Sequence, residues 1–236
     1  MSLFGGLVQA REDSDRREFT EAAKVHGSIL FGLELKCLLW LAERLPSWVS
    51  PNHLTLVGLF ASIGMGVSYC LVRVNERRGL LAVPVLLIIN WFGDSLDGTL
   101  ARVRNCMRPR YGFYVDHMVD TIGAAFLMGG LALSGLMSSG IAGGLLIAFL
   151  LLSVEVYIAT YTVGTFKMAH WRLSPTEIRI ILGAFSLVVY WFPSIKIGAH
   201  SYLLFDLLGA LGIACGIGMF IVAIFRNVRT LHRIDF

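Results

Sequence analysis

The stretch Asp94-Ser95-Leu96-Asp97-Gly98-Thr99-Leu100-Ala101-Arg102 is followed, after nine residues, by Gly112-Phe113-Tyr114-Val115-Asp116-His117-Met118-Val119-Asp120. Four aspartates therefore recur in a 27-residue window between long apolar segments. A carboxylate at membrane depth costs about 3 kcal/mol on insertion scales, which favours a function for a set of four. For a single aspartate beside an arginine, a structural ion pair is an equal alternative.

The composition is that of a membrane protein. Of 236 residues, 56% are hydrophobic and only 15% are charged, and the mean hydropathy is +0.71. We predict an all-α integral membrane protein with six transmembrane helices, because six apolar segments approach the roughly 20 residues that a bilayer requires. These segments are residues 53–72, 79–101, 112–136, 141–163, 176–193 and 202–225.

The segment before the first span has a different pattern. Residues 27–45 repeat apolar positions at helical spacing, with charged residues between them. This pattern predicts an N-terminal amphipathic helix that lies on the membrane surface. We therefore divide the chain into a cytoplasmic N-terminal segment with this juxtamembrane helix, residues 1–50, and a six-helix transmembrane domain, residues 51–236.

Lysines and arginines outside the apolar cores are unevenly distributed. Sixteen of the 20 precede the first span, follow the second, lie between the fourth and fifth, or belong to the C-terminal tail. Because such residues accumulate on the cytoplasmic side, both termini and the aspartate motif are predicted to face the cytoplasm. The membrane would be a bacterial or archaeal inner membrane or an endomembrane.

The aspartate spacing predicts a metal site. Asp94 and Asp97 are three residues apart and Asp116 and Asp120 are four apart, so each pair shares one helix face. Residues 103–111 hold three arginines and a proline, which predicts a polar turn that brings the pairs face to face. Converging carboxylates repel one another unless cations bind. Oxygen ligands favour Mg²⁺ or Mn²⁺, and two such ions would suit phosphoryl transfer.

Small residues accompany the aspartates. Gly98, Ala101 and Gly112 would let a substrate approach the helix backbone closely. Arg102, one turn past Gly98, offers a guanidinium for a phosphate. Alternatively, the two glycines are helix-packing residues, which is the commoner role of small residues in membranes.

Eight of these positions resemble the signature of the CDP-alcohol phosphotransferase (CDP-alcohol phosphatidyltransferase) family. The pattern is Asp, two residues, Asp-Gly, two residues, Ala-Arg, nine residues, Gly, three residues, Asp, three residues, Asp. The resemblance implies a six-helix enzyme of phospholipid synthesis, with residues 51–236 as its catalytic domain. A CDP-linked donor would give its phospho-group to an alcohol, and CMP would leave. The resemblance also implies a homodimer and a two-metal site at the cytoplasmic interface.

The same resemblance assigns roles to individual residues. The metal ligands would be Asp94, Asp97, Asp116 and Asp120, and Asp120 would also be the general base in members that use CDP-diacylglycerol. The CDP site would be lined by Gly98, Ala101, Arg102 and Gly112. Pro51-Asn52-His53-Leu54-Thr55 resembles the start of the family's first transmembrane helix, where Asn52 would reach the cytidine. Alternatively, Asn52 and Thr55 cap that helix.

The acceptor is less well specified. Asp116-His117 resembles the choline/ethanolamine phosphotransferase branch, in which this histidine is the proposed base for a diacylglycerol hydroxyl and Glu177 would be its partner. The donor would then be CDP-choline or CDP-ethanolamine. Alternatively, His117 is a packing residue and Glu177 an ordinary first-turn residue after Pro175. Four basic residues are expected near the cytoplasmic mouth of the site, namely Arg110, Lys167, Arg172 and Arg179. They would bind a phosphorylated acceptor. Alternatively, they only follow the positive-inside rule.

The main alternative function is a membrane transporter or ion pathway, since acidic residues in membrane helices also mark those. Transport sites usually lie near the membrane midplane between repeated halves, whereas this motif is predicted to be cytoplasmic and unrepeated. Glu155, inside the fourth span, is expected to pair with a polar group of the bundle. Basic runs interleaved with aromatic residues are absent, so nucleic acid is not an expected partner.

Overall fold

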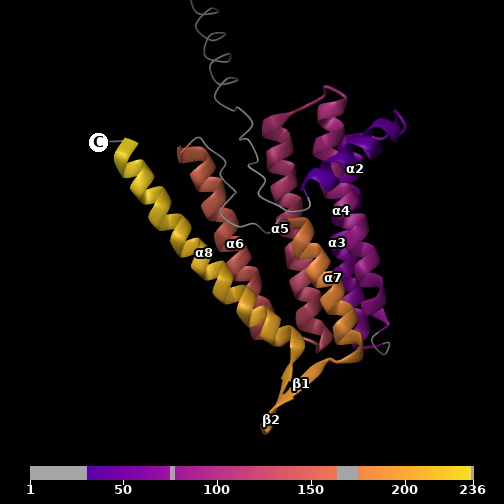
Figure 1. Ribbon diagram of the computed structural model, residues 1–236, viewed down its shortest axis with the longest axis vertical. Helices are drawn as coiled ribbons and strands as arrows, with labels where there is room; N and C mark the ends of the chain where they lie inside the picture. Colours follow the sequence, from indigo (N-terminus) through magenta and orange to yellow (C-terminus); the bar gives the residue numbers. More distant parts are fainter. Residues whose placement is uncertain (1–30, 75–77, 164–174, 235–236) are drawn as a thin grey trace, which may run out of the picture.

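The computed structural model describes residues 31–74, 78–163 and 175–234, and they form a helical bundle with one small hairpin (Figure 1). The elements in chain order are α2 (Phe31–Arg44), α3 (Pro51–Val72), α4 (Gly79–Val103), α5 (Pro109–Ser134), α6 (Ser139–Val163), α7 (Pro175–Trp191), β1 (Ser194–Ile197), β2 (His200–Leu203) and α8 (Leu204–Ile234). The predicted helical membrane fold is confirmed.

Glycines bring α3 close to both α4 and α5. A Cβ at Gly93 of α4 would lie 2.5 Å from the Gly58 nitrogen and from the Leu54 carbonyl oxygen of α3. Farther along α3, a Cβ on Gly66, or on Gly130 of α5, would overlap the backbone of the opposite helix. Because glycines allow helix backbones to approach closely in membranes, α3, α4 and α5 form the tightly packed centre of the bundle.

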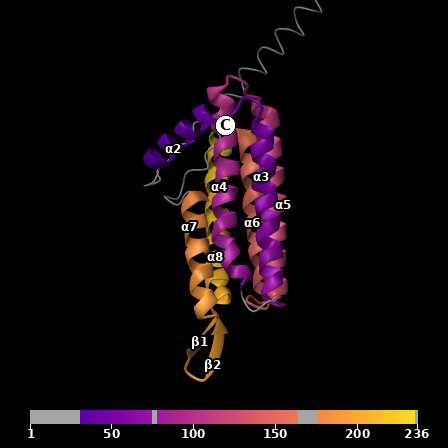
Figure 2. The ribbon, with the colours of Figure 1, turned by 90° about the vertical axis from the view of Figure 1, so that its right-hand side faces the viewer.

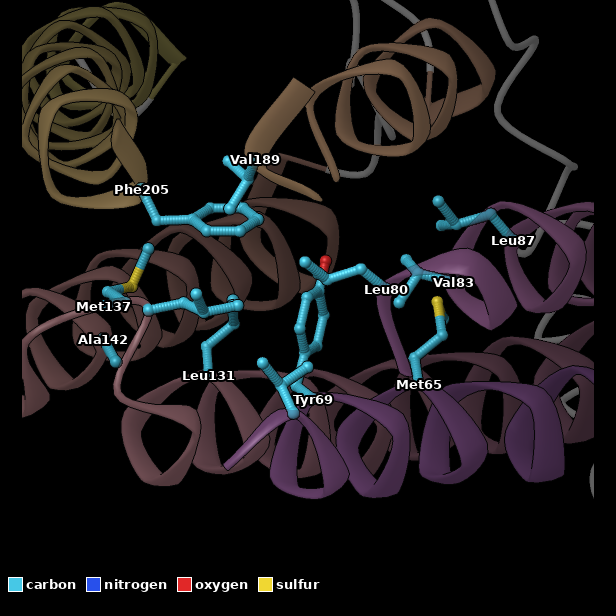
Figure 3. Close-up of a cluster of buried hydrophobic side chains, with 12 residues drawn as sticks. Met65, Tyr69, Leu80, Val83, Leu87, Leu131, Met137, Ala142, Val189 and Phe205 are labelled. Carbon is cyan, nitrogen blue, oxygen red and sulfur yellow. The ribbon is translucent and has the colours of Figure 1, made fainter. Parts of the chain in front are cut away.

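A buried apolar cluster joins six helices at the end of the bundle next to the hairpin (Figure 3). Tyr69 of α3 lies in this cluster, with its ring edge against Phe205 of α8 at a centroid distance of 5.8 Å. Its hydroxyl forms a hydrogen bond of 2.8 Å with Ser186 Oγ of α7. The polar atoms in this apolar region are therefore satisfied, as burial requires.

A second apolar cluster joins α2, α3 and α4 at the opposite end, where α2 lies obliquely against the bundle (Figure 2). The N-cap of α3 is Ser50, whose side chain accepts from the His53 nitrogen while the His53 side chain accepts from the Ser50 nitrogen. The alternative in which Asn52 and Thr55 cap this helix is therefore wrong. Both side chains are available for contacts with other elements.

The last two long helices form a pair. α6 packs against α8 and against α5, and both α6 and α8 lean away from α5 toward the end that carries the C-terminus (Figure 1). Asn227 Nδ2 of α8 donates a hydrogen bond of 2.5 Å to Glu155 Oε1 of α6. The polar partner expected for Glu155 is therefore present.

Among the described residues, five helices are long and apolar enough to cross a membrane, namely α3, α4, α5, α6 and α8. α7 has 17 residues and is therefore about 26 Å long, somewhat less than the roughly 30 Å of a hydrocarbon core. A sixth crossing stays a prediction, as does the position of α2 on the membrane surface. Residues 27–30 of the predicted surface helix lie outside the described residues.

Two predicted boundaries differ from the structure. Residues 194–203 form an antiparallel hairpin whose turn contains Gly198 at φ 63°, a conformation that suits glycine. The final helix continues to Ile234 instead of ending near residue 225. Hydropathy falls where the basic tail begins, but arginine is a good helix former, so the helix extends beyond its apolar part.

Candidate active site

Three aspartate carboxylates meet where α4 ends and α5 begins. α4 contributes Asp94 and α5 contributes Asp116 and Asp120, and one oxygen of each lies within 4.8 Å of the others. Between the helices, residues 104–108 reverse the chain, with Asn105 at φ 52°. Asparagine tolerates this left-handed conformation better than most residues. The predicted helix–turn–helix arrangement is confirmed, as is the approach of three of the four predicted carboxylates, whereas Asp97 is not part of this group.

Asp97 is held by a contact across the α3–α4 interface. Thr55 Oγ1 of α3 lies 2.6 Å from Asp97 Oδ2 and donates to it. The other carboxylate oxygen, Oδ1, accepts from the Gly98 backbone nitrogen at 2.5 Å. The Asp97 carboxylate is therefore oriented through both of its oxygens, one helical turn from Asp94.

Arg179 of α7 forms an ion pair and hydrogen bond with Oδ2 of Asp94. Its Nε also donates to Asn90 Oδ1 at 2.8 Å, and Asn90 Nδ2 donates to the Gly58 carbonyl and to Ser62 Oγ at 3.0 Å each. From the sequence, Arg179 was expected near the cytoplasmic mouth of the site, but neither its pairing with Asp94 nor a role for Asn90 was predicted. Asn90 lies four residues before Asp94, and this helical spacing was the available signal.

The small residues near the aspartates border open space. A Cβ on Gly112 would meet no heavy atom within 4 Å, and one on Gly98 would meet only the Arg102 guanidinium at 3.7 Å. Among the described residues, these two glycines therefore make no close contact with another helix. Ala101 is half-buried and Arg102 is exposed at the same end of α4.

Asn52 lies at the start of α3, opposite the first turn of α5. Its Nδ2 donates a hydrogen bond of 3.2 Å to the Tyr111 hydroxyl. Tyr111 directly precedes Gly112 in the first turn of α5. The structure thus brings the Asn52 and Gly112 regions together at one end of the bundle.

His117 is half-buried on α5, next to Asp116 in sequence. Its Nδ1 lies 2.7 Å from the Phe113 carbonyl oxygen, which can only accept a hydrogen bond. The neutral ring therefore carries its proton on Nδ1 and its lone pair on Nε2. The ring also packs on Phe113 and on Tyr157 of α6, with centroid distances of 4.1 and 4.8 Å.

Glu177 is half-buried in the first turn of α7, two residues before Arg179. Glu177 therefore lies on the same turn of α7 as Arg179, which pairs with Asp94, but its side chain is on a different face of the helix. Arg110 is exposed in the first turn of α5. Lys167 and Arg172, which we expected near the same mouth, lie outside the described residues.

The donor set of the three-aspartate cluster fits a hard divalent cation. It offers carboxylate oxygens, with Asp94 and Asp116 half-buried and Asp120 exposed to solvent. Mg²⁺ and Mn²⁺ prefer such oxygen ligands, and Mg²⁺ retains bound waters that an exposed side can supply. The cluster could therefore hold a divalent cation, with the exposed Asp120 leaving one side open to water.

Comparison with known proteins agrees with this geometry. The sequence model of the CDP-alcohol phosphatidyltransferase family matches residues 48–224, a range that includes every aspartate of the motif. The chain is 27% identical over 187 residues to cholinephosphotransferase 1 of Homo sapiens, covering 73% of this chain and 45% of the relative. It is 32% identical over 124 residues to CDP-diacylglycerol–serine O-phosphatidyltransferase of Encephalitozoon cuniculi, covering 51% and 32% respectively.

An archaeal relative shares a shorter region. Archaetidylinositol phosphate synthase of Pyrococcus horikoshii is 27% identical over 89 residues, covering 38% of this chain and 44% of that protein. The matched region spans less than half the length of each of these three curated relatives.

Proposed function

Because the chain belongs to the CDP-alcohol phosphatidyltransferase family, we propose that it transfers a substituted phosphate group from a CDP-linked donor to an alcohol and releases CMP. The observation that carries this proposal is that the carboxylates of Asp94 on α4 and of Asp116 and Asp120 on α5 lie close together. One of the two substrates would be a lipid, so the reaction would belong to phospholipid synthesis.

The aspartates would hold the metal. Asp94, Asp116 and Asp120, with Asp97 one turn along α4, would bind two Mg²⁺ or Mn²⁺ ions. When bound, the ions would neutralise the donor diphosphate and the charge that develops on the departing CMP.

The remaining motif residues would bind the donor. The open space beside Gly98 and Gly112 would admit the diphosphate close to the backbone, and the half-buried Ala101 would line the same surface. Arg102 would donate hydrogen bonds to a phosphate oxygen. Asn52, which donates a hydrogen bond to the Tyr111 hydroxyl, would contact the cytidine.

The proton of the acceptor hydroxyl would pass to one of two bases. With CDP-diacylglycerol as donor, Asp120 would accept it. With diacylglycerol as acceptor and CDP-choline or CDP-ethanolamine as donor, His117 Nε2 would accept it and Glu177 would stabilise the resulting imidazolium. In either case the acceptor oxygen forms a bond to phosphorus as the bond between that phosphorus and CMP breaks.

The end of the bundle that carries the aspartates would face the cytoplasm. In support, sixteen of the 20 lysines and arginines fall in segments assigned to that side, and a water-soluble nucleotide must enter and leave there. Both termini would share this side, and the functional unit would be a homodimer embedded in membrane lipid.

The test uses the full chain in membranes, supplied separately with CDP-diacylglycerol, CDP-choline and CDP-ethanolamine and a panel of alcohols, with CMP as readout. We expect one donor to yield CMP, chelation by EDTA to stop it, and Mg²⁺ or Mn²⁺ to restore it. Asp97→Asn and Asp116→Asn should abolish release, while Glu43→Gln on the exposed face of α2 should not. Solute flux without CMP release would instead support an ion pathway, and full activity of Asp116→Asn would contradict the metal site.

A further inference from the structure

Glu34 of α2 links three helices through one oxygen atom. Its Oε1 accepts a hydrogen bond of 2.8 Å from Trp91 Nε1 of α4 and one of 2.6 Å from Thr176 Oγ1 of α7. The two donors are 85 residues apart in sequence. Glu34 therefore fastens the start of α7 to α4, in addition to fastening α2 to both.

This link lies one helical turn from the aspartate cluster. Trp91 precedes Asp94 by three residues and Thr176 precedes Arg179 by three, so each pair shares a helix face. The offset along each helix is about 4.5 Å, from a rise of about 1.5 Å per residue. α4 and α7 are thus joined twice in succession, through Glu34 and then directly through the Arg179–Asp94 ion pair.

The first turn of α7 is the part of this helix that its own hydrogen bonds hold least. Thr176 belongs to the first turn of a helix that begins at Pro175, and first turns lack the intrahelical hydrogen bonds that hold the interior. Arg179 must nevertheless keep both its hydrogen bond to Asn90 and its ion pair with Asp94. A displaced first turn would shift the guanidinium relative to both partners.

We propose that Glu34 is a positioning residue of the active site, which holds the first turn of α7 against α4 and thereby keeps Arg179 on Asp94. Glu34 itself touches none of the aspartates in the described contacts. The catalytic consequence of this link rests on the function proposed above, whereas the structural link does not.

The structural link is tested by hydrogen exchange on the full chain in lipid nanodiscs. Glu34→Ala should speed amide exchange in the first two turns of α7, whereas Glu34→Gln, which retains the accepting oxygen, should not. Thr176→Val removes one of the two donors and should reproduce part of the Glu34→Ala effect. The double variant should equal Glu34→Ala, because loss of Glu34 already removes the contact with Thr176. Glu43→Ala, on the exposed side of the same helix, is the control. Unchanged exchange at α7 in Glu34→Ala would overturn the proposal.

The catalytic role is tested by steady-state CMP release from the same samples. Loss of a residue that orients a metal ligand typically costs about 10- to 100-fold in activity. Because Glu34 acts through Arg179, Glu34→Ala should lower kcat about tenfold, with a smaller change in KM for the donor. Glu34→Gln should stay close to the wild type. Equal loss in both variants, or no loss in either, would overturn the positioning role. If the wild type released no CMP from any donor, the proposed function would fail, while hydrogen exchange would still decide the link.

Discussion

Thr55 and Asp97 lie 42 positions apart in sequence and are joined by a hydrogen bond of 2.6 Å from Thr55 Oγ1 to Asp97 Oδ2. The contact crosses the interface that Gly58 and Gly93 make narrow. It follows that the start of α3 sets the orientation of an aspartate on α4. Several consequences of this packing can be measured.

Thr55→Val should reduce CMP release while Thr55→Ser retains most of it. Valine keeps the side-chain volume but removes the donor, and a hydrogen bond to a charged group contributes about 1.5–3 kcal/mol, equivalent to roughly a 10- to 100-fold change in rate. The measurement is kcat in membranes that contain equal amounts of protein. Equal activity of the two variants would show that the hydroxyl does not orient Asp97.

Gly93→Ala should destabilise the protein and inactivate it. The new Cβ would lie 2.5 Å from backbone atoms of Gly58 and Leu54, so α3 and α4 must separate and Asp94, the next residue, must move. Overpacking of this kind costs about 1–3 kcal/mol. Thermal unfolding in detergent and CMP release would both report it. Gly129→Ala, where a Cβ meets nothing within 4 Å, is the control and should unfold at the wild-type temperature.

Arg179→Ala should destabilise the metal-free protein and raise its affinity for Mn²⁺ several-fold. The guanidinium of Arg179 neutralises Asp94, so without it the neighbouring carboxylates repel one another when no metal is bound. The substitution also removes a positive charge that opposes a bound cation. Thermal unfolding without metal and a Mn²⁺ titration followed by electron paramagnetic resonance test the two effects. Arg73→Ala, at the far end of α3, is the control. Weaker Mn²⁺ binding by Arg179→Ala would refute this account.

Arg104 stabilises the connection between α2 and α3, so its replacement should lower the free energy of unfolding. Its guanidinium donates to the carbonyl oxygens of Leu45, Pro46, Ser47 and Val49. Arg104→Ala should lower the free energy of unfolding by about 2 kcal/mol. Arg104→Lys should recover less than half of this loss, because an ammonium group cannot span the same set of acceptors. Denaturant titration in mixed micelles would measure both, with the exposed Arg108→Ala as reference.

The sequence predicted the parts of the site that depend on local periodicity. The spacing of Asp94, Asp116 and Asp120, together with the arginine- and proline-containing turn, was sufficient to predict that these carboxylates meet. Helix positions were also predictable to within a few residues, except for the C-terminal end of α8, because apolar runs of about 20 residues have few alternatives in a membrane.

Contacts between distant helices could not be predicted in this way. A periodic pattern shows which face of a helix is polar, but it does not fix the rotation and height of one helix relative to another. Arg179 could therefore be placed near the mouth, although its pairing with Asp94 could not be foreseen. The contacts of Thr55 with α4, and of Glu34 with α4 and α7, depend in the same way on the relative positions of helices.

The hydrogen bond between Asn227 and Glu155 has a consequence for how this sequence can diverge. The bond crosses the α6–α8 interface, so a replacement of either residue alone would remove the hydrogen-bond partner of the other. Positions 155 and 227 should therefore change together among related chains, either exchanging one complementary polar pair for another or both becoming apolar.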